Sequence, residues 1–416
     1  MKYESPRGTR DILPSDIRKW QFIEGTARSV FESCNYAEIR TPVFEQTELF
    51  TRSIGEDTDI VGKEMYTFLD KGDRSITLRP EETAPVVRAC IENNLLGQNE
   101  FIKLYYIGPM FRYERPQAGR SRQFHQAGVE VFGSSDALID VEVIELGVRY
   151  FTGIGIKDLE VDINSVGCSI CRPVFKEKLK KYFEGKLDGL CENCKNRFKT
   201  NPLRILDCKE PGCQKIIEGT PATTDHICGD CRDHFDRVIG YLKQFGIAYK
   251  LNKRLVRGLD YYTKTTFEIV SRRLGAQNAV CGGGRYDDLV EELGGRSTPA
   301  VGFAIGLDRL LLVLEEQKIR VPEDQRLKVY IATLGEQSKQ KGFEVLQNLR
   351  NMGIKSDMDY QGRSLNSQLK TADKLKAQFT IIIGEDEIQN GLAVIRSMDH
   401  KTQEKVRFEE VLGKFK

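Results

Sequence analysis

Residues 108–133 constrain the fold of this chain more than any other stretch. The apolar run before them, residues 101–107, predicts a buried strand, and residues 126–132 alternate as a second strand with Gln126 and Glu130 on one face. The connection between the two strands carries four arginines: Arg112, Arg115, Arg120 and Arg122. The sequence therefore predicts a β-hairpin whose loop can close over a polyanion, because guanidinium groups match phosphate oxygens and stay charged at neutral pH.

An exposed basic hairpin without a ligand is the ordinary alternative for such a loop. The strand after the loop argues against it, because Glu130 and Gln126 lie on one side of an otherwise apolar strand and need polar partners there. Fixed carboxylate and amide groups beside an arginine loop suit a cationic group that is attached to a phosphorylated molecule. We therefore expect a binding site for such a molecule at this hairpin.

The 416 residues are enough for two or three domains, and a hydrophobic content of 40% is enough for ordinary cores. A net charge of +2 does not by itself indicate a nucleic-acid partner. No apolar run reaches the roughly 18 residues of a membrane span, and the first residues lack a signal-peptide core, so we expect a cytoplasmic protein with no membrane partner. In that compartment the eleven cysteines should be thiols or metal ligands rather than disulfides.

Before the hairpin, the sequence predicts a helix and an edge strand. Helical spacing of apolar residues runs from Asp16 to about Cys34, and the strand pattern over residues 38–45 contains Pro42. Because proline cannot donate a ladder hydrogen bond, this strand should lie at an edge or at an interface.

Residues 75–79 predict a further strand, which an Arg-Pro pair ends. Glu82 or Thr83 can begin the helix that follows, so Glu81 stands at the end of the strand, where open sheets tend to present functional groups. A carboxylate that caps the helix is the ordinary explanation for Glu81.

Residues 166–250 are predicted to be an insertion, because a lysine-rich, cysteine-rich stretch of helical spacing interrupts the strands there. Its eight cysteines are closely spaced in pairs: Cys168, Cys171, Cys191, Cys194, Cys208, Cys213, Cys228 and Cys231. Such pairs suit tetrahedral zinc bound by four thiolates, and eight free buried thiols are the alternative. Consecutive pairs around each ion are the simplest arrangement, but the spacing does not fix the pairing, and His226 and His234 are nearby substitutes.

Strand patterns return after the insertion. Residues 255–270 contain a turn followed by aromatic and β-branched residues, whose tyrosine pair could be ordinary sheet packing. The glycine triplet at residues 282–284 lets a ligand approach the backbone closely. A small-residue strand, residues 301–306, runs into a helix that begins near Arg309, where backbone N–H groups and the helix dipole favour anions. An arginine paired with a surface carboxylate is the alternative for that residue.

A linker over residues 317–325 precedes a second unit, in which strands alternate with helices. Strands are expected at residues 329–333, 355–360, 379–384 and 392–398, and helices at residues 338–352, at residues 365–376 and at the terminus. This alternation predicts an α/β unit with a mostly parallel or mixed sheet.

Several of these strings resemble the class II aminoacyl-tRNA synthetases. Phe111-Arg112-x-Glu114 with the arginine loop is similar to motif 2 of that class, and Gly306-Leu-x-Arg309 is similar to motif 3, whose arginine holds ATP. The first helix and the strand with the proline resemble motif 1, which builds the dimer interface in that class.

The histidyl-tRNA synthetase family is matched more closely than the class as a whole. The strings that resemble this family are the loop at residues 115–126, the Arg-Pro-Glu-x-Thr segment ending at Thr83, the Arg-Gly-Leu-Asp-Tyr-Tyr segment at residues 257–262 and the Cys-Gly-Gly-Gly-Arg-Tyr-Asp-Asp segment at residues 281–288. The motifs stand in the order of the family and cover nearly the whole chain.

The resemblance implies an α+β catalytic core around an antiparallel sheet, spanning residues 1–325 and interrupted by the mostly helical insertion at residues 166–250. Residues 326–416 would be an α/β anticodon-binding domain. The motif 1 resemblance implies a homodimer, and in this family the insertion lies over the acceptor arm of the tRNA. Structural zinc would depart from the family pattern, since histidyl-tRNA synthetases as a group do not require it.

The implied reaction is the ATP-dependent attachment of L-histidine to tRNA(His) through histidyl-adenylate, with Mg²⁺ arriving with ATP. Arg112 and Arg257 would be the catalytic residues at the α-phosphate, and Gln117 would touch the acceptor end of the tRNA. The histidine-binding residues would be Glu81, Thr83, Arg112, Gln126, Glu130, Arg257, Tyr261, Tyr262 and Tyr286. The ATP-binding residues would be Arg112, Glu114, Arg120, Phe124 and Arg309.

Two other functions share parts of this pattern. The regulatory subunit of ATP phosphoribosyltransferase resembles the same core but charges no tRNA, and it tends to lose both the string at residues 257–262 and the C-terminal domain. A class II ligase that joins histidine to another acceptor is the second, and the predicted C-terminal domain argues against it.

Overall fold

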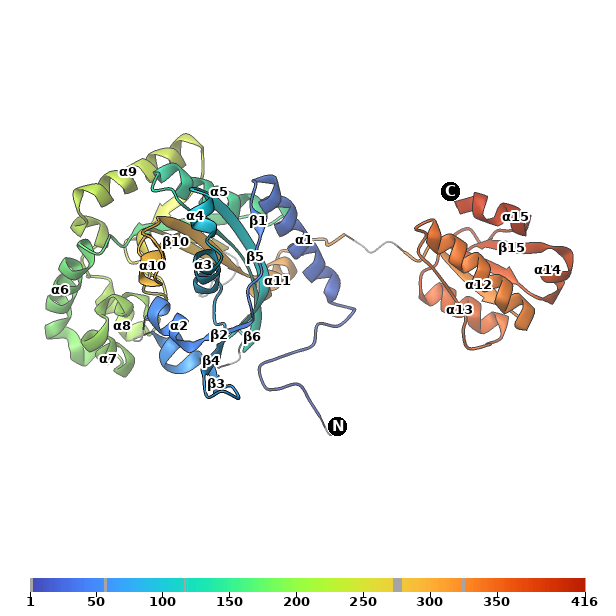
Figure 1. Ribbon diagram of the computed structural model, residues 1–416, viewed down its shortest axis with the longest axis horizontal. Helices are drawn as coiled ribbons and strands as arrows, with labels where there is room; N and C mark the ends of the chain where they lie inside the picture. The colour runs from blue at the N-terminus through green and yellow to red at the C-terminus, as the bar shows by residue number, and fades with distance from the viewer. Residues whose placement is uncertain are drawn as a thin grey trace. The chain divides into compact units, whose positions relative to one another are not determined.

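The computed structural model describes residues 3–55, 58–115, 117, 119–271, 279–322 and 326–415. Pro116 of the hairpin loop and the last three residues of the expected linker lie outside the described residues. The chain divides into two compact units, residues 1–321 and residues 322–416, and each has its own hydrophobic core (Figure 1). Each unit is described by itself.

The first unit is built on an eight-stranded sheet in the order β1-β5-β6-β11-β10-β9-β7-β8. Neighbours from β5 to β7 pair antiparallel, whereas β1 and β8 pair parallel at the two edges. The strands are β1 (Ala37–Glu38), β5 (Ile102–Phe111), β6 (Gln123–Phe132), β7 (Leu159–Ser165), β8 (Tyr249–Leu251), β9 (Thr263–Ser271), β10 (Ala279–Arg285) and β11 (Ala300–Gly306). A small antiparallel sheet joins β2 (Phe44–Gln46), β4 (Ser75–Leu78) and β3 (Tyr66–Leu69).

Helices cover both faces of the large sheet. α1 (Ile17–Ser33), α5 (Ala137–Gly153) and α11 (Leu307–Glu316) share one core with its first face, in which the rings of Phe31, Tyr150 and Phe303 meet. Residues of α3 (Thr83–Glu92) and of the insertion share the second core with Tyr106 of β5. Shorter helices are α2 (Thr47–Ile54), α4 (Leu95–Gln98) and α10 (Leu289–Glu292), with a π-helical turn at Ile60–Glu64.

The insertion is helical, as predicted. Its helices, drawn in green in Figure 1, are α6 (Cys171–Phe183), α7 (Glu192–Thr200), α8 (Pro211–Ile217) and α9 (Gly229–Gln244), joined by 3₁₀ turns at Glu184–Gly189, Pro202–Asp207 and Thr223–His226. Its apolar side chains, such as Phe175 and Ile205, are buried in the same core as Tyr261 and Tyr286 of the strand region. The α+β core with a helical insertion that the sequence predicts is therefore confirmed.

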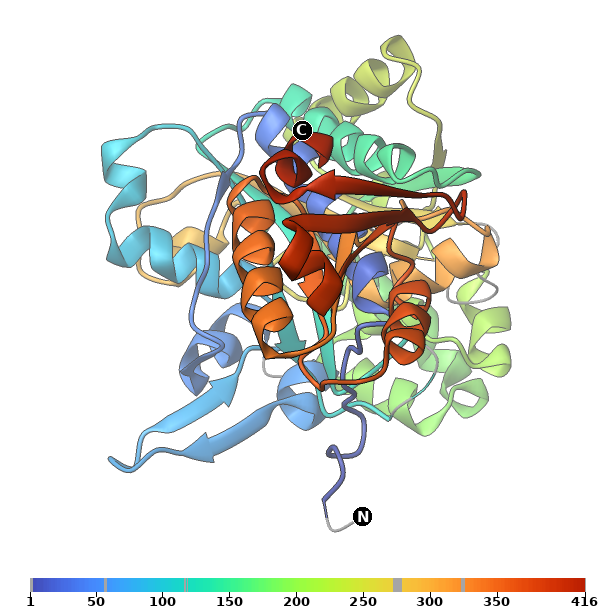
Figure 2. The same ribbon diagram turned by 90° about the vertical axis from the view of Figure 1, so that its right-hand side faces the viewer.

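The second unit, drawn in orange to red in Figure 2, has a five-stranded sheet in the order β13-β12-β14-β15-β16. The first three strands are parallel and the last two antiparallel, which is the predicted mixed sheet. Its strands are β12 (Val329–Thr333), β13 (Ser356–Met358), β14 (Phe379–Ile383), β15 (Leu392–Ser397) and β16 (Gln403–Arg407). Its helices are α12 (Glu336–Asn351), α13 (Leu365–Lys374), α14 (Glu385–Asn390) and α15 (Phe408–Val411), followed by a 3₁₀ turn at Leu412–Phe415.

Two predicted strands differ in the structure. Residues 38–45 form the ends of β1 and β2 in different sheets, because Pro42 lacks a donor and the Thr41 carbonyl accepts instead from buried Arg79 at 3.0 Å. The strand predicted after the turn at residues 258–260 begins only at Thr263, since Arg172 of the insertion binds the carbonyls of Asp260 and Tyr262.

The sequence prediction also missed α14 and β16 in the second unit. β16 carries one buried apolar residue, Val406, among charged neighbours, so it has no strand-like alternation of apolar residues. Among the described residues, every helix is too short or too polar to cross a membrane.

Candidate active site

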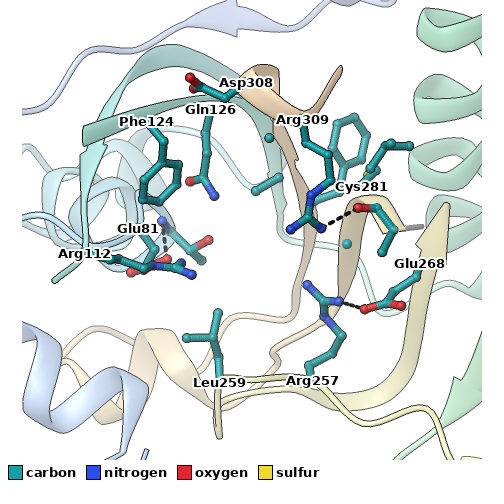
Figure 3. Close-up of a pocket in the computed structure, with 18 of the residues that line it drawn as sticks. Glu81, Arg112, Phe124, Gln126, Arg257, Leu259, Glu268, Cys281, Asp308 and Arg309 are labelled. Carbon is teal, nitrogen blue, oxygen red and sulfur yellow. Dashed lines mark hydrogen bonds and ion pairs between the residues drawn. The ribbon is translucent and has the colours of Figure 1, made fainter. Parts of the chain in front are cut away.

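A pocket of about 270 Å³ opens between the β5–β6 hairpin, the start of α3 and strands β9 to β11. It collects residues from the strings that resemble motifs 2 and 3 and from those at residues 79–83, 257–262 and 281–288, although these lie far apart along the chain. The predicted site residues that line it are Glu81, Thr83, Arg112, Glu114, Arg120, Phe124, Gln126, Glu130, Arg257, Tyr261, Tyr262, Tyr286 and Arg309. Figure 3 shows Arg112, Phe124 and Gln126 on one wall, facing Arg257, Glu268 and Arg309 on the other.

Glu130 forms the buried polar end of the pocket. Its side chain is 1% exposed, and it accepts hydrogen bonds from Thr83 Oγ1 at 2.7 Å and from the Tyr286 hydroxyl. Burial raises the pKa of Glu130 to about 8, although both hydrogen bonds favour the ionised form. The predicted alternation of β6 is what places this carboxyl on the pocket face.

Glu81 combines the capping role and the pocket position. Its carboxylate accepts from the backbone N–H groups of Thr83 at 2.8 Å and Ala84 at 3.0 Å, so it stabilises the start of α3. The hydroxyl of Tyr261 also lies 3.4 Å from it. Burial raises the pKa of Glu81, and the two N–H donors oppose that shift.

Two polar atoms near this end lack protein partners within the part of the chain that the structure describes. They are Oε1 of Gln126 and the hydroxyl of Tyr106. Both residues line the pocket and both atoms are buried. An unpaired buried acceptor favours a ligand that can donate to it.

The opposite end of the pocket is rich in arginine. The Nε of Arg112 donates to the Pro80 carbonyl at 2.9 Å, and its guanidinium lies 5.3 Å from the centre of the Phe124 ring. Arg120 forms an ion pair with Glu114 at 3.2 Å. The bond from Nε to the backbone fixes the base of the Arg112 guanidinium, and its Nη1 lies 3.9 Å from the carboxylate of Glu114.

Arg257 is held by a residue that the sequence reasoning assigned no role. Its Nη1 donates to Glu268 of β9, and this carboxylate outweighs the burial that disfavours the charge, so the pKa of Arg257 is raised. A Cβ at Gly282 would lie 2.0 Å from Nη2 of Arg257. The glycine of the triplet is therefore required for the arginine itself.

Arg309 lies in the first turn of α11. Its Nη1 donates to the Ala279 carbonyl at 2.8 Å. Burial and the neighbouring Arg120 lower the pKa of Arg309. Two arginines that repel each other across a pocket favour an anion between them.

Only part of the arginine loop reaches the pocket. The guanidinium of Arg122 lies 3.8 Å from the centre of the Tyr113 ring, and its Nε and Nη1 donate to backbone carbonyls. Arg115 and Gln117 are exposed, and neither lines the pocket. Gln117 instead pairs its backbone with Arg120 in the loop.

Glu268, Tyr106 and Asp308 are among the pocket residues that the sequence reasoning missed. Asp308 accepts from the backbone N–H of His125 at 2.8 Å and so ties α11 to β6. Glu268 has a weak signal in hindsight, since it is the one acidic residue in a strand of hydroxyl and apolar side chains. Tyr106 has no signal, because buried tyrosines are common in strands.

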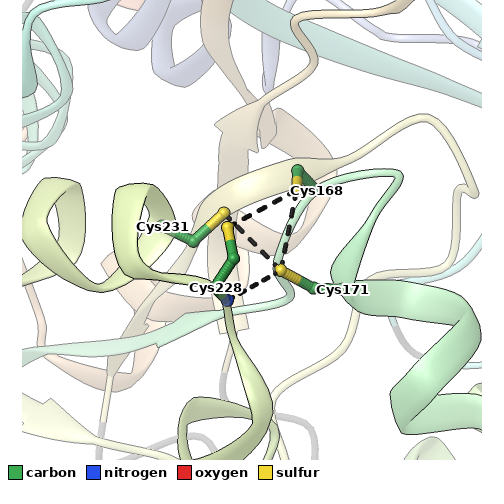
Figure 4. A group of neighbouring side chains, drawn as sticks. All are labelled: Cys168, Cys171, Cys228 and Cys231. Carbon is green, nitrogen blue, oxygen red and sulfur yellow. Dashed lines mark hydrogen bonds between the residues drawn. The ribbon is translucent and has the colours of Figure 1, made fainter.

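The eight insertion cysteines gather into two clusters, and each cluster holds four sulfurs within 4.8 Å of one another. The first cluster is Cys168, Cys171, Cys228 and Cys231 (Figure 4), and the second cluster is Cys191, Cys194, Cys208 and Cys213. The pairs are therefore nested along the chain, and the consecutive pairing that was the simplest expectation is wrong. The reason is that α6 and α9, at the two ends of the insertion, bring the first and last pairs together (Figure 4).

Neither nearby histidine belongs to a cluster. His234 pairs with buried Asp140 at 3.2 Å, and His226 packs against the ring of Phe175. The sulfur distances in the first cluster are 3.6 Å between Cys168 and Cys171 and 3.9 Å from each of them to a cysteine of α9 or its cap. A tetrahedral ion with 2.3 Å bonds to sulfur requires separations of about 3.8 Å, so the thiols fit such an ion without rearrangement.

Comparison with known proteins gives consistent matches. The model of the family described as Histidyl-tRNA synthetase matches residues 8–180 and 214–310, and that of the Anticodon binding domain matches residues 328–416. The Histidine--tRNA ligase of Desulforamulus reducens is 53% identical over 407 residues, which cover 98% of this chain and 97% of the relative. The structure of apo S. aureus histidyl-tRNA synthetase matches with a TM-score of 0.84 at 40% identity and covers 99% of each chain.

A Bacillus halodurans structure described as an ATP phosphoribosyltransferase regulatory subunit/histidyl-tRNA synthetase also matches. Its TM-score is 0.66 at 22% identity, and the match covers 92% of this chain and 99% of that one. At this identity the likeness shows a common fold alone.

Proposed function

The chain belongs to the histidyl-tRNA synthetase family, and we propose that its pocket activates L-histidine with ATP and transfers it to tRNA(His). The observation that supports this most is the division of the pocket into a buried carboxyl end at Glu130 and an arginine end at Arg112 and Arg257. The first end suits the polar ring and amino group of histidine, and the second suits its carboxylate beside a phosphate. The regulatory-subunit alternative has only the likeness of fold in its support.

Histidine is selected by hydrogen bonds at the buried end. Glu130 accepts from one ring nitrogen, and the hydroxyl of Tyr262 meets the other, with Tyr286 beside them. An amino acid without this pair of ring nitrogens would leave buried polar groups unpaired, so it is rejected. The amino group meets Glu81, Thr83 and Gln126, and the unpaired Oε1 of Gln126 supports this assignment.

Adenylation then takes place between the arginines. An oxygen of the histidine carboxylate attacks the α-phosphorus of ATP, a new C–O–P linkage forms, and pyrophosphate leaves with the electrons of the broken P–O bond. Arg112 spans the carboxylate and the α-phosphate, and Arg257 neutralises the charge that grows on the phosphate oxygens. No side chain becomes covalently attached, so the protein contributes position and charge.

ATP is held by the residues of the hairpin and of α11. Glu114 and Phe124 meet the adenine, and Arg120 and Arg309 meet the terminal phosphates, in agreement with the mutual repulsion of the two arginines. Mg²⁺ arrives with ATP and offsets part of its negative charge.

The second step uses the tRNA. A hydroxyl of its terminal ribose attacks the carbonyl carbon of the adenylate, and AMP leaves. We assign residues 1–325 to this catalytic domain, with the insertion at residues 166–250, and residues 326–416 to binding of the anticodon, supported by the match at residues 328–416. Gln117 is assigned to the acceptor end because it is exposed on the loop next to Arg120.

The two cysteine clusters are assigned to structural zinc. Four thiols at these separations fit the ion, and soft sulfur ligands favour zinc over Mg²⁺. Zinc bound there would join the ends of the insertion, while the residues of the active site would do the chemistry. We also assign a homodimer, supported by the motif 1 resemblance, and a cytoplasmic location, where tRNA and ATP are available.

The test is histidine-dependent exchange of pyrophosphate into ATP, measured on the purified full chain with each of the twenty amino acids in turn. We expect exchange with histidine alone, and its loss in Arg257→Ala and Glu130→Ala, followed by charging of tRNA(His). Silence with every amino acid, from folded protein that retains its metal, would refute the proposed function.

A further inference from the structure

The loop that carries Arg257 and Tyr262 is held from outside by the cysteine-rich insertion. Arg172 donates through Nη1 to the carbonyl of Asp260 at 2.9 Å and through Nη2 to the carbonyl of Tyr262. Arg204 donates through Nη1 to the carbonyl of Arg257 at 3.3 Å. The same short stretch of backbone therefore presents Arg257, Tyr261 and Tyr262 to the pocket and three of its carbonyls to the insertion.

Both donor arginines are positioned by the cysteine clusters. Arg172 directly follows Cys171 of the first cluster, in the first turn of α6. Arg204 lies in the segment between Cys194 and Cys208, whose two ends the second cluster joins. The backbone of Arg172 is thus adjacent to one cluster, and that of Arg204 is flanked by cysteines of the other.

A third insertion residue extends the contact. Nδ2 of Asn201 donates to both carboxylate oxygens of Asp260 at 3.1 Å. Arg204 and its neighbour Arg197 both reach Asp59 on the other side, at 3.9 Å and 2.5 Å. One segment, flanked by second-cluster cysteines, therefore contacts both the loop at residues 257–262 and Asp59.

The segment between the second-cluster cysteines has little regular structure of its own, and Ile205 and Leu206 anchor it in the second core. Between the second-cluster cysteines stand one helix of nine residues and a 3₁₀ turn of six residues, and helices of that length are marginal without tertiary support. An ion bound by four thiolates would join the two ends of the segment. The segment would then have much less conformational entropy to gain when its packing is lost. Loss of that ion would free Asn201 and Arg204, and the loop with them.

We propose that metal bound in the two cysteine clusters stabilises the loop at residues 257–262, an arrangement that we call the brace. Arg172, Asn201 and Arg204 are the positioning residues that connect the clusters to this loop. The brace rests on the proposed function, since it assigns the insertion a part in histidine activation besides any part in binding tRNA. It predicts that the metal state of the insertion controls the first half-reaction, in which no tRNA takes part.

The chain offers a matched control for Arg172. Arg232 directly follows Cys231 of the first cluster, just as Arg172 directly follows Cys171. Its guanidinium donates to the Thr224 carbonyl at 2.9 Å, within the insertion and away from the loop. Removing Arg232 therefore perturbs the same cluster without removing a contact to residues 257–262.

The test compares full-length wild type, Arg172→Ala, Arg172→Lys, Asn201→Ala and Arg232→Ala. Three quantities are measured: zinc released on blocking the thiols, hydrogen exchange of the backbone at residues 257–262, and histidine-dependent pyrophosphate exchange without tRNA. We expect Arg172→Ala to keep its zinc, to exchange hydrogen faster at the loop and to lose about 10- to 100-fold in kcat/KM, because small displacements of positioned groups have effects of this size. Arg172→Lys should recover part of this loss, Asn201→Ala should lose less, and Arg232→Ala should match wild type.

Stripping zinc from the wild-type protein with a chelator should produce the same loop exchange and the same loss of activity as Arg172→Ala. The brace alone is overturned if the wild type exchanges pyrophosphate with histidine and both Arg172→Ala and the zinc-stripped protein match it. The match must hold for hydrogen exchange at residues 257–262 and for the rate of pyrophosphate exchange. If Arg172→Ala does not fold, Asn201→Ala and the zinc-stripped wild type are compared with the untreated wild type in its place, by the same measurements and with the same criterion. Wild-type protein that is inactive with every amino acid overturns the proposed function and the brace with it.

Discussion

Glu268 determines where the guanidinium of Arg257 points, and its charge can be removed without changing its size. Glu268→Gln should lower kcat of pyrophosphate exchange by about 10-fold with little change in the histidine KM, because a neutral amide holds the guanidinium more weakly while the buried end of the pocket stays intact. Steady-state exchange kinetics measure the two constants separately. Glu145→Gln removes one partner of the exposed Arg149 pair and should leave both constants unchanged. An equal effect of the two substitutions would contradict this role.

Glu130 should make histidine binding depend on pH. Burial raises its pKa to about 8, so in the free protein it carries a proton below that pH and must lose it to accept an N–H from the imidazole. The affinity for histidine should therefore rise with pH, by up to about tenfold per unit, and level off near pH 8.

The variant Glu130→Gln isolates this titration. It cannot ionise, so the part of the pH dependence that belongs to Glu130 should vanish, and binding above pH 8 should be weaker than in wild type. The imidazole of the substrate itself titrates near pH 6.5 and cancels when the two proteins are compared. The check is the histidine KM of pyrophosphate exchange from pH 6 to 9, and a parallel curve for the variant would contradict the assignment.

Among single residues, the pocket residues that stand in recognisable sequence strings were predicted. Pocket residues outside such strings were not. Arg112, Glu130 and Tyr262 stand in strings whose order and spacing carry information about the family. Glu268 stands alone in a strand, and its role follows from the position of Arg257 in space, which no local pattern encodes. Gly282 was predicted to allow a close approach to the backbone. That the approaching group is the guanidinium of Arg257 could not be inferred from the sequence.

Among the elements, α5 offers a clean measure of what a helix cap contributes. Asp136 accepts from the N–H of Leu138 at 2.8 Å and also pairs with Arg237 of α9 at 3.0 Å. Asp136→Ala should lower the free energy of unfolding by about 1 kcal/mol, whereas Asp136→Asn keeps a capping oxygen and should stay within about 0.5 kcal/mol of wild type. Urea unfolding followed by circular dichroism measures both. Equal losses would mean that the exposed ion pair, and not the cap, stabilises this end.

Element types were predicted well where one face of a segment packs against the core, as in α1 and α12. The predictions failed where side chains that are distant in the sequence form hydrogen bonds with backbone carbonyls. The carbonyls of residues 257–262 bond to arginines of the insertion, so aromatic residues that favour a strand form a loop there. The nesting of the cysteine pairs has the same origin, because it depends on α6 and α9 meeting across the whole insertion.

At the scale of the whole molecule, the two units have different parts in the proposed function. Residues 326–415 bury their own core around Ile331, Leu346 and Ile381, and every predicted residue of the pocket lies in the first unit. Every group to which the proposed function assigns a part in adenylation therefore lies within residues 1–321. Recognition of the tRNA, in contrast, extends over both units in the proposed function.

This division predicts that a chain ending at residue 325 separates the two half-reactions. Histidine-dependent pyrophosphate exchange should stay within about threefold of the full chain, since no group of the pocket is removed. Charging of tRNA(His) should lose about 100-fold or more in kcat/KM, because one of two linked binding sites is missing and the benefit of simultaneous binding is lost with it. Adding residues 326–416 as a separate chain should not restore charging, since the link between the units supplies that benefit. Loss of exchange in a truncated chain that is still folded would show instead that the second unit supports the pocket.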